Sequence, residues 1–260
     1  MASCAGGKAA TERDRKASSA PAWQGDADES CRAVDESAHG VVLRTRPLTE
    51  TSLVVHWLTV AHGRVVTVAK GARKPKSPFA GKMDFGVEAD FTFVRSRRSQ
   101  LHIVREVMVT ARHGGLAADL GQLQQAAYAV HFVELITETD FPMPEVCELF
   151  LGLLQYLAHV PPQPRTIFAF ELKLLALQGL EPDTDDDSVP QPVRDLMAQL
   201  LNSTWADLKS LKPSAPVVRQ LRQFLHEFIV QHCQRLPKGR AEALAAGAPS
   251  ARTVHPADNL

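Results

Sequence analysis

The order of apolar and polar residues changes near residue 113, and the change divides the chain into two kinds of structure. Before it, short runs rich in Val, Leu and Thr alternate with turn-like breaks, a pattern that predicts β-strands. After it, apolar residues recur every three or four positions, which predicts helices. The expected strands cover residues 40–48, 50–59, 63–72, 85–96 and 101–112.

Five short strands within residues 40–112 are the right number and length for a small closed barrel such as the OB-fold. In the third of them, Val65, Thr67 and Ala69 share one side, as alternate residues of a strand do. Trp57 is expected in the barrel core, as are Phe91 and Phe93, which also share a face.

The helical half of the chain has clear ends. Pro144 opens one expected helix near its first turn, and Pro161 and Pro162 stop it. The expected fold class is therefore α+β and multidomain, an N-terminal five-stranded OB-fold barrel followed by an all-α domain. The expected divisions are a disordered tail at 1–38, a nucleic-acid-binding OB-fold at 39–112, a helical domain at 113–236 and a flexible tail at 237–260.

The formal net charge of zero hides an uneven distribution of charge. Residues 40–112 hold 13 Lys and Arg against 5 Asp and Glu, whereas residues 113–234 hold 7 against 15. A basic barrel attracts polyanions and an acidic helical domain does not. The two parts therefore suggest two kinds of partner.

The segment KGARKPKSP, residues 70–78, concentrates the positive charge. It carries four cations and no acidic residue, which suits a line of phosphates, although a merely solvated loop remains an alternative. Contacts of this type would be mostly electrostatic and indifferent to base sequence. The candidate phosphate-binding residues are Arg64, Lys70, Arg73, Lys74, Lys76, Lys82, Arg95, Arg97 and Arg98.

Binding of single strands on OB-folds usually adds aromatic side chains on which bases stack. The barrel segment offers few of them, and Phe79, beside the basic segment, is the best stacking candidate. A structural role for this ring stays open.

Catalytic and metal-binding signatures are missing from the sequence. The four cysteines, Cys4, Cys31, Cys147 and Cys233, form no CxxC pair, and neither HExxH, G-x-S-x-G nor a phosphate-binding GxxxxGK[ST] loop occurs. We therefore expect no enzyme, no metal and no cofactor. The chain also has no secretory signal and no apolar run that could span a membrane, so a cytoplasmic protein is expected.

Three stretches resemble the RecO family of DNA repair proteins. They are GVVLRTRPLTETSLVVHWLTVAHGRVVTVAKGARKPKSP at 40–78, AAYAVHFVELITETDFPMPEVCELFLGLLQYL at 126–157 and FELKLLALQGLEPD at 170–183. Many members of that family carry a four-cysteine zinc element after the last of these. Here that place reads TDDDSVPQPV, at 184–193, so the resemblance is to the branch without zinc.

The resemblance implies a non-enzymatic recombination mediator at the nucleoid. Such a protein binds single- and double-stranded DNA, anneals complementary strands and, with RecR, helps load RecA on DNA coated by single-strand-binding protein. The helical domain would contact RecR and the acidic C-terminal tail of single-strand-binding protein. A pocket for that tail needs a cation at its rim, for which the candidates are Arg165, Lys173, Arg219 and Arg222.

Two other classes stay open on the residues alone. One is an OB-fold protein that binds RNA or a ribosomal surface without annealing activity. The other is an adaptor whose basic face meets acidic proteins. Strand annealing distinguishes the mediator from the adaptor. A preference for RNA over DNA, which would require contacts to the 2′-hydroxyl, distinguishes the RNA-binding protein from the mediator.

Overall fold

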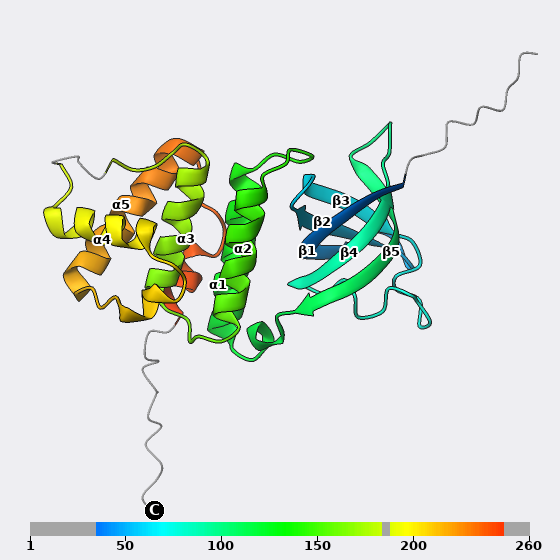
Figure 1. Ribbon diagram of the computed structural model, residues 1–260, viewed down its shortest axis with the longest axis horizontal. Coiled ribbons are helices and arrows are strands. Elements are labelled where there is room, and N and C mark those ends of the chain that lie inside the picture. Colours follow the sequence, from blue (N-terminus) through cyan, green and yellow to red (C-terminus); the bar gives the residue numbers. More distant parts are fainter. Residues whose placement is uncertain (1–34, 184–187, 247–260) are drawn as a thin grey trace, which may run out of the picture. The chain divides into compact units, whose positions relative to one another are not determined.

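The computed structural model describes residues 35–183 and 188–246, in which a strand barrel precedes a set of helices (Figure 1). The barrel closes in the order β1-β2-β3-β5-β4, with β3 and β5 parallel and the other neighbouring strands antiparallel. The expected five-stranded OB-fold is thus confirmed. The strands are β1 (Asp35–Pro47), β2 (Leu53–Thr59), β3 (Gly63–Ala69), β4 (Val87–Val94) and β5 (Leu101–Arg112).

Alternation along the strands builds the barrel core. In β3 every second residue is buried, and Val65, Thr67 and Ala69 form the inward side as the sequence predicts. The Trp57 ring stacks on Phe91 with 4.1 Å between centroids, and its Nε1 donates to Thr67 Oγ1 at 2.9 Å. That bond satisfies the single polar atom of the indole, so the large ring can be buried without cost to hydrogen bonding.

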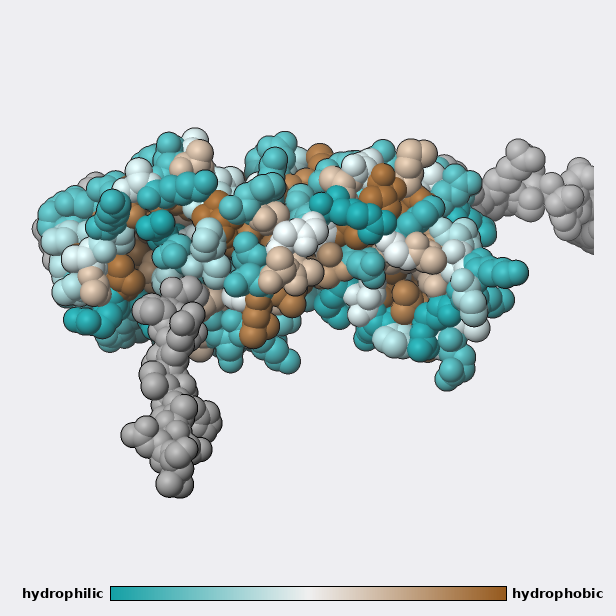
Figure 2. Space-filling model, turned by 90° about the horizontal axis from the view of Figure 1, so that it is seen from below, coloured by the Kyte–Doolittle hydropathy of each residue, from teal (hydrophilic) through white to brown (hydrophobic). Residues whose placement is uncertain are grey.

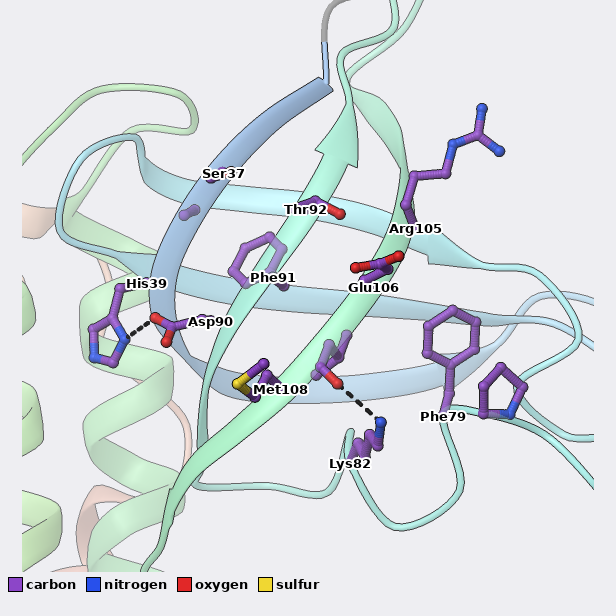
Figure 3. A pocket seen from close by; sticks show the side chains of 13 residues that line it. Ser37, His39, Phe79, Lys82, Asp90, Phe91, Thr92, Arg105, Glu106 and Met108 are labelled. Atoms are coloured by element: carbon purple, nitrogen blue, oxygen red, sulfur yellow. Dashed lines mark hydrogen bonds and ion pairs between the residues drawn. The ribbon is translucent and has the colours of Figure 1, made fainter.

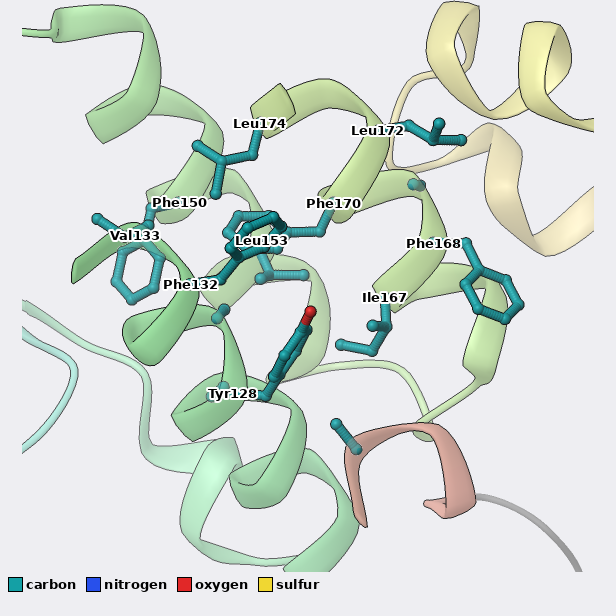
Figure 4. Close-up of a cluster of buried hydrophobic side chains, with 14 of the residues drawn as sticks. Tyr128, Phe132, Val133, Phe150, Leu153, Ile167, Phe168, Phe170, Leu172 and Leu174 are labelled. Atoms are coloured by element: carbon teal, nitrogen blue, oxygen red, sulfur yellow. The ribbon is translucent and has the colours of Figure 1, made fainter. Parts of the chain in front are cut away.

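The helical part has one large core, part of which Figure 4 shows. Phe132 of the first long helix packs there against Phe170 of the third, edge to face at 6.5 Å. The helices are α1 (Leu120–Ile136), α2 (Pro144–Leu157), α3 (Pro164–Leu177), α4 (Gln191–Asn202), α5 (Ala215–Cys233) and α6 (Arg240–Ala245), with short 3-10 turns η1 (Gly114–Ala117) and η2 (Asp207–Ser210).

A buried ion pair ties α6 to this core. Arg240 donates through Nε to Glu171 Oε1 at 2.7 Å and through its second terminal nitrogen to Oε2 at 2.9 Å. The Tyr128 hydroxyl donates to the same carboxylate. Burial, followed by the neighbouring Glu171 charge, raises the pKa of Tyr128 well above its ordinary value, so the phenol keeps the proton that it donates.

The first residues of β3 lie against the loop between α1 and α2. Gly63 has a φ of +65°, and a Cβ on it would lie 1.8 Å from the Phe141 carbonyl oxygen, so only glycine permits this approach. The Asp140 N–H donates to the Arg64 carbonyl at 2.9 Å. Leu43 and Leu58 of the barrel also belong to the core of the helical part, so the two parts share buried apolar surface.

The ends of the two domains differ from expectation. Strand β1 begins at Asp35, inside the tail expected at 1–38, because residues 35–41 pair with β4. Residues 1–34 lie outside the described part of the chain. Helix α6 occupies part of the flexible tail expected at 237–260, since the Arg240 ion pair and the buried Leu244 fix it to the core.

Hydrophobic side chains reach the surface in small groups among hydrophilic ones on the face that Figure 2 shows. The most exposed large ones are Met108 on β5 and Leu120 at the start of α1, each 70% exposed. In residues 35–183 and 188–246, no helix combines the length and the apolar character that a membrane span requires.

Candidate nucleic-acid interface

The basic loop, residues 70–78, follows β3 as a series of turns. Its four cations, Lys70, Arg73, Lys74 and Lys76, are all exposed, and none forms an ion pair with a described residue. Gly71 has a φ of +74° and no close neighbour at the Cβ position other than the Lys74 side chain, so it serves the turn itself. The predicted cluster of unneutralised positive charge is therefore present at the surface.

Hydrogen bonds fix the basic loop to the turn between β1 and β2. The Arg73 guanidinium donates to the Thr49 carbonyl at 2.9 Å, and the Arg73 backbone N–H donates to the Thr51 carbonyl at 3.0 Å. In OB-folds the loop between the first two strands contributes to ligand binding. The contact thus places the cations of the basic loop beside a region that this fold uses for oligonucleotides.

Arg95 and Arg64, two of the predicted phosphate ligands, have other partners. Arg95 binds both oxygens of Glu36, at 2.7 and 2.9 Å, and Asp140 at 2.8 Å. Its hydrogen bond to Glu36 is the largest cause of a raised pKa of the guanidinium. Arg64 is half-buried and donates to the Thr137 carbonyl at 2.5 Å. Both arginines connect the barrel to the loop after α1. For Arg95, which two carboxylates already hold, the predicted role in holding phosphate is not supported. Arg64 keeps one buried nitrogen, Nε, without a hydrogen-bond partner among the described residues.

Phe79 and Lys82 also lie differently from the prediction. Phe79 is only 8% exposed and packs into the barrel core, so its ring is not the exposed stacking platform that the sequence suggested. Lys82 donates to the Val107 carbonyl at 2.9 Å (Figure 3). The two residues line a groove of about 540 Å³ over β1, β4 and β5, in which Asp90 and Glu106 offset the charges of Lys82 and Arg105.

The remaining predicted cations fall into two groups at opposite ends of β3. Arg97 and Arg98 are exposed in the hairpin between β4 and β5. Leu101, the first residue of β5 after this hairpin, pairs with Val66 near the start of β3. The basic loop begins after Ala69, at the other end. With about 3.3 Å per strand residue, the two groups lie on the order of 20 Å apart. A ligand that contacts both must run along the outer face of the barrel.

Arg44 and Arg46 of β1 lie on that outer face, and sequence reasoning missed them. Both are exposed, and their spacing of two residues puts them on the same side of the strand. In the sheet, Arg44 of β1 lies opposite His56 of β2, and His56 lies opposite Val66 of β3. Arg44 is therefore level with the middle of β3, with β2 between them. The alternation Arg-Thr-Arg within an expected strand was the signal that could have revealed them.

A groove of about 500 Å³ opens beside these arginines, and we call it the junction groove. Within it Glu134 of α1 accepts from Arg44 Nε at 2.7 Å and lies 3.8 Å from His56 Nδ1. Burial, and after it the charge of Arg44, lowers the pKa of His56 to about 4, so this imidazole is neutral at pH 7. The lining comprises Arg44, Arg46, His56, Arg64, Val66, Gln100, Leu101, Glu134 and Thr139.

The four partner-site candidates separate into two pairs. Arg165 donates to the Leu211 carbonyl at 2.8 Å and Lys173 donates to the Leu201 carbonyl, so both cations satisfy backbone groups within the helical core. Arg219 and Arg222 are exposed on α5, although Arg222 also donates to the Leu244 carbonyl at 3.3 Å. They line a mainly apolar groove of about 520 Å³ together with Leu236, Ala241 and Leu244.

No cluster of three or more His, Cys, Asp or Glu side chains suited to a metal ion occurs in the described parts of the chain. Cys147 is buried, and burial raises the pKa of its thiol to about 12, so it behaves as a core residue. Residues 184–187, part of the segment where the resembling family places zinc ligands, lie outside the described residues.

An OB-fold with an exposed basic loop defines a class of barrels suited to binding nucleic-acid backbones. Two family models match this chain in order: "Recombination protein O N terminal" over residues 34–112 and "Recombination protein O C terminal" over residues 117–193. The chain belongs to the recombination protein O (RecO) family.

Relatives from several bacteria carry the name "DNA repair protein RecO". The protein of Rhodopirellula baltica is 32% identical over 147 residues, which are 55% of this chain and 53% of the relative. The protein of Anaeromyxobacter sp. (strain K) is 35% identical over 151 residues, 56% and 58% of the two chains. That of Bacillus subtilis is 30% identical over 147 residues, 55% and 56%. The chain thus spans little more than half the length of these relatives.

Proposed function

We propose that this protein is a non-enzymatic mediator of DNA repair and recombination, which binds single- and double-stranded DNA through the barrel and anneals complementary strands. The exposed basic loop is the observation that carries the proposal. Lys70, Arg73, Lys74 and Lys76 share one loop without a carboxylate among their ion-pair partners in the described residues. The names of the relatives support the link to DNA repair.

Annealing follows from where the cations bind. Lysine and arginine at the phosphate backbone release condensed counterions and lower the repulsion between two strands. Because backbone contacts carry no sequence information, the bases stay available for pairing. The burial of Phe79 fits this division, since stacking on an aromatic ring would hold bases away from their complement.

With RecR, the protein would help load RecA on DNA that single-strand-binding protein covers, in the cytoplasm at the nucleoid. The groove beside α5 is the candidate site for the acidic C-terminal tail of single-strand-binding protein. Its apolar lining, including Leu236 and Leu244, suits apolar side chains of such a tail, and Arg219 and Arg222 suit its carboxylates. Arg165 and Lys173 are less suited, because both are half-buried and donate to backbone carbonyls of the helical core.

An annealing assay with complementary oligonucleotides tests the proposal. We expect acceleration on naked strands and on strands coated with single-strand-binding protein, with steep loss as salt is raised. Tight binding without annealing would instead favour an OB-fold protein for RNA or a ribosomal surface. Absence of any DNA binding at low salt would refute the proposal and would favour an adaptor whose basic face binds acidic proteins.

The tail site needs its own measurement. Arg219→Glu with Arg222→Glu should abolish binding of a fluorescent acidic tail peptide while leaving binding to naked DNA unchanged. Lys209→Glu with Lys212→Glu, two exposed lysines elsewhere in the helical domain, is the matched control. Equal loss in the control would show that the effect is one of net charge and not of this groove.

A further inference from the structure

The junction groove continues from the barrel onto the helical domain. A second depression, of about 420 Å³, shares Arg44 and Glu134 with it and adds His131, Leu135 and residues 235–238 to the lining. The carbonyl of Lys238 accepts a hydrogen bond from His131 Nδ1 at 3.1 Å, which fixes this segment against α1. Arg235 and Lys238 are both exposed there. The two depressions therefore form one track that joins the domains.

The charge of the track is positive although the helical domain as a whole is acidic. Cationic side chains come from β1, β3 and the segment after α5, and Glu134 is the single carboxylate in the two linings. Glu134 already bonds Arg44 at 2.7 Å and so can neutralise only part of this charge. The five cations of the track are Arg44, Arg46, Arg64, Arg235 and Lys238.

Two buried nitrogens without partners point to a ligand in the same place. Arg64 Nε and His56 Nε2 are buried, and neither has a hydrogen-bond partner among the described residues. Both side chains line the junction groove. Buried polar groups are rarely left unsatisfied, and an acceptor oxygen such as that of a phosphate would satisfy Arg64 Nε and, in the tautomer that carries its proton there, His56 Nε2.

The track is also continuous with the basic loop. Pro47, Leu53 and Ala69 lie side by side in β1, β2 and β3, so Arg46 and the start of the basic loop lie at the same end of these three strands. From Arg46 the cations continue to Arg44 and then to the helical segment. A flexible polyanion that binds the loop therefore meets further positive charges along β1 and in the junction groove.

We propose that the phosphate backbone of a single strand runs from the basic loop through the junction groove to Arg235 and Lys238, with Glu134 as an internal counter-ion that the strand displaces from Arg44. This extends the proposed function and depends on it. The helical domain then contributes directly to DNA binding, and the site extends beyond the barrel.

Oligothymidylates of about 8 and about 30 nucleotides separate the barrel from the whole track, since the short one lies within the range of about 4 to 16 nucleotides for a single barrel and the long one lies above it. Neutralising Arg235 and Lys238 together (R235Q/K238Q) should make the salt slope for the long probe less negative by about 1.4, the value for two single-strand phosphates. The slope for the short probe should not change. Lys209→Gln with Lys212→Gln should affect neither probe.

Glu134→Gln tests the internal counter-ion. It should tighten binding of the long probe by a factor of roughly 2 to 5, the range that the free energy of an exposed ion pair sets. Glu138→Gln removes the same charge four residues later, beyond the end of α1 and at an exposed position outside the groove, and should have a smaller effect. Equal effects of the two variants would remove Glu134 from its assigned role.

An unchanged long-probe slope in R235Q/K238Q would overturn the extended track, as would equal losses on both probes. Lys74→Gln with Lys76→Gln, measured in parallel, tells which proposal has failed. If this loop variant weakens binding and R235Q/K238Q does not, the barrel binds DNA and the track is wrong. If neither variant has an effect, the proposed function itself has failed.

Discussion

Neutralising Lys74 and Lys76 should change the salt dependence of single-strand binding by a calculable amount. Both side chains are exposed, and neither has an ion-pair partner among the described residues. The substitution of both by glutamine therefore removes two charges without breaking an internal contact. Any change in affinity then reports on contacts with DNA.

The magnitude follows from the number of exposed cations that a strand can meet on the barrel. We count six, in the basic loop, on β1 and in the β4–β5 hairpin: Lys70, Arg73, Lys74, Lys76, Arg46 and Arg98. At about 0.7 counterions per single-strand phosphate, the slope of log K against log salt should be about −4.2 for the wild type and about −2.8 for the variant. From about 50 to about 200 mM salt, affinity should fall about 300-fold and about 50-fold respectively.

Fluorescence anisotropy with the short labelled oligothymidylate, which meets the barrel alone, measures both slopes. Lys209→Gln with Lys212→Gln is the matched control, because it removes two exposed charges from the helical domain. Circular dichroism should show the same fold for all three proteins. Equal slopes for the wild type and the loop variant would refute the assignment of the basic loop to the phosphate backbone.

Three further results are expected. Arg240→Ala should lower the free energy of unfolding in urea by about 3 to 5 kcal/mol, because it leaves the buried Glu171 carboxylate without its cation; a loss below about 1 kcal/mol would contradict this. Arg95→Ala should lower the melting temperature yet keep low-salt DNA affinity within about twofold of wild type, since its partners are carboxylates; a large loss of affinity would restore it to the DNA site. In a histidine NMR titration His56 should stay neutral down to about pH 4. Because an unfolded histidine gains its proton near pH 6.5, His56 should make the fold less stable as pH falls from about 6.5 to about 4, and His56→Gln should remove that contribution.

Local patterns made the elements of the fold predictable. The period of two in Val65–Thr67–Ala69 and the prolines at the helix ends are properties of neighbouring residues, and the structure has strands and helices close to where they indicate. The exposed cations of the basic loop were predictable for the same reason. Four positive charges and two prolines in nine residues cannot be buried at acceptable cost.

Contacts between distant segments were not predictable in this way. Arg95 takes its partners from Glu36, in a segment expected to be disordered, and from Asp140, which is 45 positions away. The burial of Phe79 depends on the closure of the barrel around it. The junction groove needs β1, α1 and the segment after α5 at once, so no single stretch of sequence contains its signal.

The ion pair between Arg240 and Glu171 has a consequence for synthesis of the chain. Glu171 is fully buried in α3, and its carboxylate meets its cation only when a residue 69 positions later has emerged from the ribosome. The barrel contains all its strands by residue 112 and can close much earlier. Domains generally fold in order from the N-terminus during translation. During synthesis, therefore, the barrel should be formed before α6 has been made and the helical core is complete. In that interval the incomplete core should be a substrate for chaperones.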